Sequence, residues 1–282
     1  MISSTETGIE LLYLQDSDVN LYAAHNGNDG IMLFEGRNVR FVGNMHPTSL
    51  SDLSAIQNGG SGISVEKSEN VTIGHAGRGF LDNGQHGISI GPESRHIELI
   101  GVRASGNQGA GVCIARADNV RLSPGGNASA RIAGNQAAGI EVEDAAHVRL
   151  IALPGEANDI GLGSTVGIEV LGQDSDDIAI SGWAIFENRE AGIRVADATD
   201  VLIGGFGEGE GNSIGVNKNG IVASGAAAQV TIANNHIWRN QPLALLTGMD
   251  WRAGPAQCLH PAGPTRGRPA WAWSWTGGSR GP

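Results

Sequence analysis

The chain has 282 residues, a formal net charge of −11 and 44 glycines, about twice the average glycine usage. This acidic balance argues against a nucleic-acid partner, because phosphate backbones are bound by clustered lysine and arginine. Two cysteines, Cys113 and Cys258, are too few for a disulfide framework or a zinc site, and no apolar run reaches the roughly 18 residues of a membrane helix.

From its N-terminus onward, the chain repeats one short frame. The frame opens with Gly-φ-x-φ, where φ is apolar, and continues through a polar stretch to a second φ-x-φ, a third short apolar stretch and an Asn. The segment GSGISVEKSENVTIGH at 60–75 is one copy, and AGIRVADATDVLIGG at 191–205 belongs to another. Successive opening positions lie 22 to 32 residues apart, and they are Gly8, Gly30, Gly62, Gly87, Gly111, Gly139, Gly167, Gly192, Gly220 and Ala244.

Apolar residues alternate with other residues inside each copy, which is the pattern of a half-buried β-strand. Ile63 and Val65 are such a pair in a first strand, Val201 and Ile203 in a second strand, and Phe80 marks a third inward position. Three short strands cannot bury their inner faces alone. Parallel stacking of the copies solves this, because each apolar residue then lies on its equivalent in the neighbouring coil.

An asparagine precedes most opening glycines, at the bend between copies. It stands at Asn26, Asn58, Asn83, Asn107, Asn135, Asn188, Asn217 and Asn240, and Gly163 takes its place once. Asn tolerates the left-handed backbone conformation, and its amide can bond to the equivalent Asn of the next coil. We therefore expect a stacked, hydrogen-bonded asparagine ladder. Gly163 can also adopt the left-handed conformation, but it has no side chain with which to make the ladder bond.

This frame resembles the right-handed parallel β-helix repeats of the pectate-lyase-like superfamily, above all the generic repeats of large bacterial secreted and surface proteins. Residues 200–241 carry the likeness best, with I-G-G, G-N-x-I and G-I in the same order. The resemblance implies an all-β, right-handed parallel β-helix, a solenoid of about ten coils over residues 1–250. Such a rod is on the order of 45 Å long. Because the first repeat begins at Gly8, without room for a capping helix, we expect a piece of a longer protein.

The composition changes after Asp250. Residues 251–282 contain no Ile, Val, Asn, Asp, Glu or Lys, but four Trp, five Pro and four Arg. One hypothesis is an appendage that binds sugar or a partner through tryptophan stacking and arginine. The other, which we favour, is a disordered tail, or an out-of-frame end of a truncated gene.

Function on such a scaffold depends on outward side chains, because apolar residues fill the inside. In one outward column Glu141 is expected beside Glu169, and in another Arg121 beside Arg149. Paired glutamates could hold a raised pKa and move a proton, while the arginines clamp a uronate carboxylate. However, the two columns belong to different strands and are expected to face different sides of the rod. The simpler interpretation is a solvated face of mixed charge.

Two further residues are candidates. His86, in NGQHGISI, is a possible catalytic group, although a single histidine at a turn is usually just a polar residue. Arg194, expected beside Glu169, is a third candidate binding group with Arg121 and Arg149. Lyases of the resembled fold use Arg or Lys with calcium-binding Asp, and its hydrolases use clustered Asp with a Gly-His-Gly segment. Neither cluster is found here, so we expect no metal site and no cofactor, with calcium entering only under a lyase alternative.

Most repeats are close to the minimum length, which predicts a shallow and open face. The sequence therefore predicts a non-catalytic rod that binds polysaccharide or a partner. An extracellular or cell-surface location is implied by the family resemblance. The alternative is a carbohydrate-active enzyme, a polysaccharide lyase, hydrolase or epimerase, acting on a uronate-rich polymer. A third possibility is a structural module of a longer adhesin.

Overall fold

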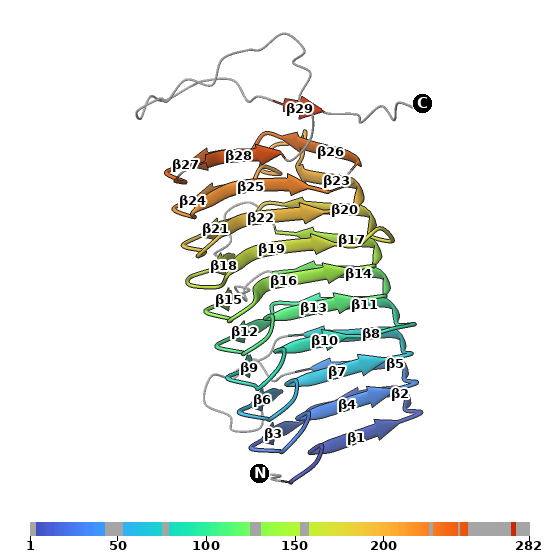
Figure 1. Cartoon of the computed structure of the whole chain (residues 1–282). Coiled ribbons are helices and arrows are strands. Elements are labelled where there is room, and N and C mark those ends of the chain that lie inside the picture. Colours follow the sequence, from blue (N-terminus) through green and yellow to red (C-terminus); the bar gives the residue numbers. More distant parts are fainter. Residues whose placement is uncertain are drawn as a thin grey trace.

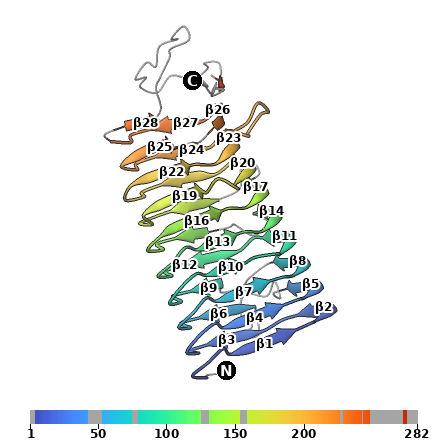
Figure 2. The same ribbon diagram turned by 45° about the vertical axis from the view of Figure 1, so that its right-hand side comes forward.

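The structure, a computed structural model, describes residues 4–42, 53–74, 79–124, 131–152, 158–225, 228–241, 243–247 and 272–274. Its regular elements are all β-strands, and they wind repeatedly around one axis. Figure 1 shows the coils stacked from the N-terminal end upward, and Figure 2 shows the same stack from another side. The chain is thus an all-β parallel β-solenoid.

The first strand of each coil belongs to a ten-stranded parallel sheet, here called the first sheet. Its strands are β1 (Ile9–Leu12), β4 (Ile31–Phe34), β7 (Ile63–Glu66), β10 (Ile88–Ile90), β13 (Val112–Ala115), β16 (Ala138–Glu143), β19 (Val166–Leu171), β22 (Ala191–Ala196), β25 (Asn219–Ser224) and β28 (Leu243–Thr247). Because every strand pairs with the equivalent strand of the neighbouring coil, outward side chains form columns along the rod.

The second strand of each coil belongs to the second sheet. Its parallel strands are β2 (Gln15–Val19), β5 (Arg37–Val42), β8 (Glu69–Gly74), β11 (Arg95–Ile100), β14 (Asp118–Ser123), β17 (Ala146–Ile151), β20 (Asp176–Ser181), β23 (Thr199–Gly204) and β26 (Ala228–Ala233). At its end β29 (Ala272–Ser274) pairs antiparallel with β26. The rest of the 251–282 tail, and with it the expected disorder, lies outside the described residues.

The third sheet closes each coil with nine short parallel strands. They are β3 (Tyr22–Ala24), β6 (Ser54–Ile56), β9 (Gly79–Leu81), β12 (Arg103–Ser105), β15 (Arg131–Ala133), β18 (Asp159–Gly161), β21 (Ala184–Phe186), β24 (Ser213–Gly215) and β27 (His236–Trp238). Nine complete coils therefore run from β1 to β27. The expected ten slightly overstates this number, because the described residues give the tenth coil only its first strand, β28.

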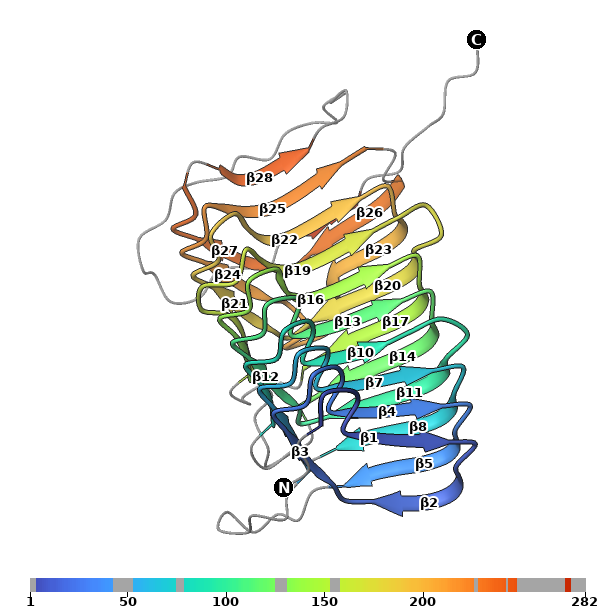
Figure 3. The same ribbon diagram turned by 60° about the horizontal axis from the view of Figure 1, so that its bottom comes forward.

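The three sheets enclose one apolar core. Figure 3, tilted toward the N-terminal end, shows the strands of the three sheets around a common interior. The predicted inward positions are confirmed, since Ile63, Val65, Phe80 and Ile203 are fully buried. Ile63 lies in register between Ile31 and Ile88. The core is therefore built from columns of equivalent apolar residues, as the repeat predicted.

The asparagine ladder is present in two runs. Asn58 donates from Nδ2 to Oδ1 of Asn83 at 3.0 Å, and Asn83 donates in the same way to Asn107 at 3.0 Å. Equivalent side-chain bonds join Asn26 to Asn58, Asn107 to Asn135, Asn188 to Asn217 and Asn217 to Asn240. Within each run the side-chain amides join successive coils, and those of Asn58, Asn83 and Asn107 are buried and bond the coils on both sides.

The backbone reason for these asparagines differs from our expectation. The left-handed residue is the one before the ladder position, such as Gln57 (φ 57°) before Asn58 and Asp82 (φ 54°) before Asn83. The ladder asparagines do not appear among the residues with positive φ. Asn is therefore required for the reach of its amide, and the preceding residue makes the turn.

The break at Gly163 is only partly a loss of bonding. The N–H of Asn135 donates to Oγ of Ser164 at 3.3 Å, so the neighbouring serine accepts part of the ladder bond. On the other side of the break, Oδ1 of Asn188 is buried and has no partner among the described atoms. Glycine in this position thus leaves one amide oxygen without a donor.

Candidate functional site

The outward column of the first sheet brings together several of the predicted residues. Cys113 lies in register with Glu141, Glu141 with Glu169, and Glu169 with Arg194. These residues come from β13, β16, β19 and β22, so neighbours in the column are one strand spacing apart, about 4.8 Å. The expected adjacency of Glu141, Glu169 and Arg194 is therefore observed.

Arg194 is held between two carboxylates. Its Nη1 donates to Oε1 of Glu169 at 2.8 Å, and its Nη2 donates to Oε2 of Glu190 at 2.5 Å. Together the two carboxylates outweigh the single positive charge. Any acidic ligand of Arg194 would compete with both of them, so the surroundings of Arg194 favour an ion-pair role over the binding of a uronate.

Glu141 has an apolar environment on this outer face. Ala110, Ala138, Val166 and Ala191 form a small cluster with Cys113 on the outside of the first sheet, separate from the main core. Burial, reinforced by the nearby charges of Glu169 and Glu143, raises the pKa of the half-buried Glu141 carboxyl. Burial also raises the pKa of the Cys113 thiol to about 12, so this thiol is not a nucleophile at neutral pH.

We expect Glu141→Gln to raise the thermal unfolding midpoint at pH 8 and to change it little at pH 4. The raised pKa means that ionising Glu141 costs folding free energy above the folded-state pKa. Below the ordinary glutamate pKa of about 4.3, both folded and unfolded states bind the proton and the cost disappears. Thermal unfolding of wild type and variant across this pH range measures the difference.

Glu10→Gln is the matched control, because Glu10 is exposed in the same outward column and lies beside Met32. This control should show no comparable gain at pH 8. A Glu141→Gln protein that is no more stable than wild type at pH 8 would contradict the raised pKa of the half-buried Glu141 carboxyl.

The third catalytic candidate lies apart from the glutamates. His86 immediately precedes the coil of β10, two coils away from the β16 coil that carries Glu141. Its Nδ1 accepts a hydrogen bond from the N–H of Ala110 at 3.1 Å, and burial lowers its pKa. A neutral ring whose Nδ1 is already an acceptor carries its proton on Nε2. His86 therefore has a structural bond and no described glutamate partner.

Arg121 and Arg149 lie in register on the second sheet, as expected. Arg149 donates to the carboxylate of Asp177 at 2.6 Å and to its carbonyl oxygen at 2.5 Å. Figure 3 shows the first and second sheets as different walls of the coil. The hypothetical uronate site combining these arginines with Glu141 and Glu169 is therefore not assembled.

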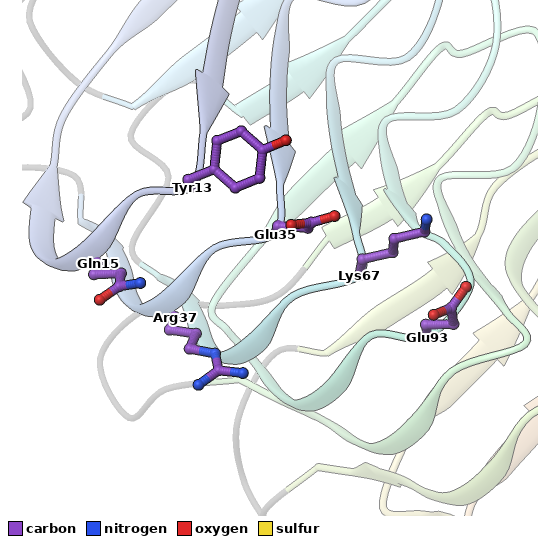
Figure 4. A pocket seen from close by; sticks show the side chains of 6 residues that line it. All are labelled: Tyr13, Gln15, Glu35, Arg37, Lys67 and Glu93. Atoms are coloured by element: carbon purple, nitrogen blue, oxygen red, sulfur yellow. The ribbon is translucent and has the colours of Figure 1, made fainter.

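A concave feature among the described residues lies elsewhere, at the corner where the first sheet turns into the second. This corner pocket has a volume of about 370 Å³ (Figure 4). It is lined by Tyr13, Gln15, Glu35, Arg37, Lys67 and Glu93. Our sequence interpretation missed it because we compared only the positions inside the φ-x-φ strands. The signal was present just after the first strand, where Tyr13, Glu35 and Lys67 occupy equivalent corner positions.

Comparison with known proteins identifies the family. A model described as the right handed beta helix region matches residues 86–250, which is more than half of the chain. The chain belongs to the right-handed β-helix proteins. The three coils preceding residue 86, from β1 to β9, continue the same sheets. None of the curated protein sequences compared with this β-helix protein matches it.

Several solved β-helix structures resemble it in fold. The A-module of the Azotobacter vinelandii mannuronan C-5 epimerase AlgE4 is 14% identical, aligns over 88% of this chain and 83% of its own, and has a TM-score of 0.47. The periplasmic alginate epimerase AlgG is 13% identical over 79% of this chain and 61% of its own, with a TM-score of 0.40. PfbA, a surface adhesin of Streptococcus pneumoniae, is 12% identical over 86% and 83%, with a TM-score of 0.25.

These likenesses concern the fold alone, and the chain spans 61% of the length of that AlgG structure. Within the described ranges of this β-helix protein, His, Cys, Asp and Glu residues form no group of three or more arranged to hold a metal ion. The same ranges contain no helix that could span a membrane.

Proposed function

We propose that the chain is a non-catalytic β-helix rod that binds a polysaccharide or a surface partner, outside the cell or at its surface. The observation that carries this proposal is the register of the outward columns. Side chains such as Cys113, Glu141, Glu169 and Arg194 follow one another at a single strand spacing. Such a linear array suits an extended polymer, and solenoid proteins commonly bind through extended surfaces of this kind.

The distribution of the candidate catalytic groups also supports a binding role. Arg121 and Arg149 lie on the second sheet, whereas Glu141 and Glu169 lie on the first. Acid–base catalysis requires its groups within hydrogen-bond reach of one bound substrate. Groups on two different walls of a rod do not meet this requirement together.

One observation favours the carbohydrate-active enzyme as a second candidate. Glu141 and Glu169 lie side by side, and burial raises the pKa of Glu141. A carboxyl of raised pKa beside a second carboxyl is a pairing that glycan-cleaving enzymes use. A lyase, hydrolase or epimerase acting on a uronate-rich polymer would have to use this pair on the first sheet.

A single experiment separates the two functions. The full chain is incubated with neutral and uronate polysaccharides, with and without calcium, and both reaction products and retardation in affinity electrophoresis are recorded. We expect retardation by at least one polysaccharide without new reducing ends, unsaturated uronates or epimerised units. The physical reason is that the outer columns offer contacts along a chain but no convergent acid and base.

The Glu141→Gln and Glu169→Gln variants complete this test. Product formation by wild type that both variants abolish would establish the enzyme and overturn the binding rod. Retardation that survives in both variants, without products from any of the three proteins, is the result expected of a non-catalytic rod. If wild type neither reacts nor is retarded, polysaccharide binding is wrong and the structural module becomes the better account.

A further inference from the structure

The corner pocket is built from equivalent positions on four successive coils. Tyr13, Glu35, Lys67 and Glu93 each follow a first-sheet segment, and each has a positive φ, between 49° and 60°. Their backbone N–H groups bond to the next coil. The N–H of Tyr13 donates to the carbonyl oxygen of Phe34 at 2.9 Å, and the N–H of Glu35 donates to the carbonyl oxygen of Glu66 at 3.1 Å. The backbone under the pocket is therefore fixed in register, and the corner side chains stand in a row on it.

The charges of the pocket are balanced and available. Two carboxylates, Glu35 and Glu93, alternate with the cation of Lys67 along the row, while Arg37 and Gln15 begin the neighbouring second-sheet strands. Within the described part of the chain, none of the four charged groups forms an ion pair, although Arg37 lies in register with Glu69 on β8. Lys67 is instead placed by a cation–π contact, with Nζ 5.2 Å from the centre of the Phe34 ring.

An exposed aromatic ring borders these polar groups. Tyr13 is 63% exposed, one of the few large apolar side chains of the described residues left in solvent, and its neighbour Leu12 is 50% exposed. Figure 4 shows the Tyr13 ring above Glu35, with Lys67 and Glu93 farther along the same edge. An aromatic face beside several hydrogen-bonding groups suits a ligand that has both an apolar face and many polar edges.

The chemistry of the lining selects among such ligands. Carboxylates accept hydrogen bonds from hydroxyl groups, whereas Arg, Lys and Gln donate to hydroxyl oxygens. A ligand with a net charge meets as much repulsion as attraction among two acids and two cations. The chain as a whole carries a formal charge of −11, which further disfavours polyanions. A volume of about 370 Å³ lies within the range of small-molecule sites, about 300–1,000 Å³.

We propose that the corner pocket is a glycan-binding subsite that takes an uncharged pyranose unit, with its apolar face on Tyr13 and its hydroxyl groups among Glu35, Arg37 and Lys67. This inference rests on the proposed polysaccharide-binding function and names the site and the sugar class. Adjacent units of the same glycan extend along the corner, where Glu93 follows on the next coil.

The test uses Tyr13→Asn in the full chain. Asparagine is one of the residues that best tolerates the φ of 56° at this position, so the variant loses the ring without straining the backbone. Binding is measured by affinity electrophoresis in soluble β-glucan and galactomannan, which are neutral, and in alginate and polygalacturonate, which are acidic. Titration calorimetry with oligosaccharides of the retained polymer then gives the dissociation constants.

We expect retention by a neutral glycan and a loss of about tenfold in affinity in Tyr13→Asn, typical of a lost aromatic contact. Tyr13→Phe keeps the ring and should keep most of the affinity. Phe206→Asn is the matched control, because Phe206 is 67% exposed in the segment between β23 and β24, far from the pocket. This control should bind like wild type.

Each of the other outcomes would overturn either the site, the sugar class or the proposed polysaccharide binding. If a glycan retains wild type and Tyr13→Asn equally, the corner pocket is not the site, while the proposed function stands. If only the acidic polymers are retained and Tyr13→Asn abolishes this, the assignment to an uncharged sugar is wrong. If no glycan retains wild type, the proposed polysaccharide binding fails and the subsite fails with it.

Discussion

Asn83→Ala is expected to lower the free energy of unfolding by about 4 kcal/mol, because it leaves several buried polar groups without partners at about 1–3 kcal/mol each. The Asn83 side chain is fully buried and all its bonds are made. Its Oδ1 accepts from the N–H and Nδ2 of Asn58, and its Nδ2 donates to Asn107 and to the carbonyl oxygen of Ala55. Alanine removes these four bonds at once and also leaves a cavity.

Chemical denaturation followed by circular dichroism measures this loss. Asn28→Ala is the matched control, since Asn28 is exposed and, among the described residues, its side chain bonds only to Oγ1 of Thr7, at 3.3 Å. Amide hydrogen exchange gives a second readout, because the N–H of Asn58 loses its acceptor in Asn83→Ala and should exchange faster. Equal stability losses in the two variants would show that the ladder contributes nothing beyond an ordinary surface asparagine.

Gly167→Ala is expected to destabilise the protein by about 3 kcal/mol, the upper end of the usual cost of overpacking. Gly167 is one of the glycines that open the repeat, and none of the described ones is among the glycines with positive φ. Glycine is required here because there is no room for a Cβ atom. A Cβ at residue 167 would lie 2.5 Å from the carbonyl oxygen of Gly192 and 2.5 Å from Cγ2 of Ile185. Neither the neighbouring coil nor the third sheet can move away without disturbing the core.

The control for this substitution is Gly74→Ala. A Cβ on Gly74 would meet nothing closer than 3.6 Å, from Cβ of Ile100, so its stability should stay near that of wild type. Thermal unfolding of the two variants provides the comparison. If Gly167→Ala were as stable as Gly74→Ala, the opening glycines would have to be explained by something other than close packing between coils.

The repeat predicted most of the fold because its period reflects which residues are buried: each coil must place apolar side chains at the same inward positions. The apolar pair Ile63 and Val65 has an equivalent in each copy, because such a pair is buried only when it stacks on its equivalents. The structure places both residues in register with the equivalent residues of the two neighbouring coils. The asparagine ladder follows from the same period. A second ladder was not recognised: Asn212 donates to Asn235 at 2.9 Å, but the preceding coil carries Trp183 in this column. Asn158 stands in the same column one coil before Trp183, but its side chain has no partner among the described atoms. Only two members are therefore bonded, too few to be recognised as a ladder.

The candidate site was less predictable, because columns identify neighbours without showing what each side chain contacts. The column order placed Glu141 beside Glu169 correctly. It did not show that Arg194 also bonds Glu190, or that an apolar cluster lies around Cys113 on the outer face. Burial on an outer face depends on how neighbouring side chains cover one another, and this is not encoded in strand periodicity.

By itself, the sequence determined the parallel solenoid, its inward columns and the ladder positions, because these depend on spacing and residue type alone. The sequence also led us to expect Arg121 and Arg149 on a different side of the rod from Glu141 and Glu169, and the structure places them on two sheets. The tertiary structure decided which groups each of these side chains contacts, such as the two carboxylates that hold Arg194. It also decided that corner residues from four coils line one pocket. The physical reason is that a repeat specifies contacts along a column, whereas a site combines side chains from different columns, whose relative position is set by the turns between the sheets.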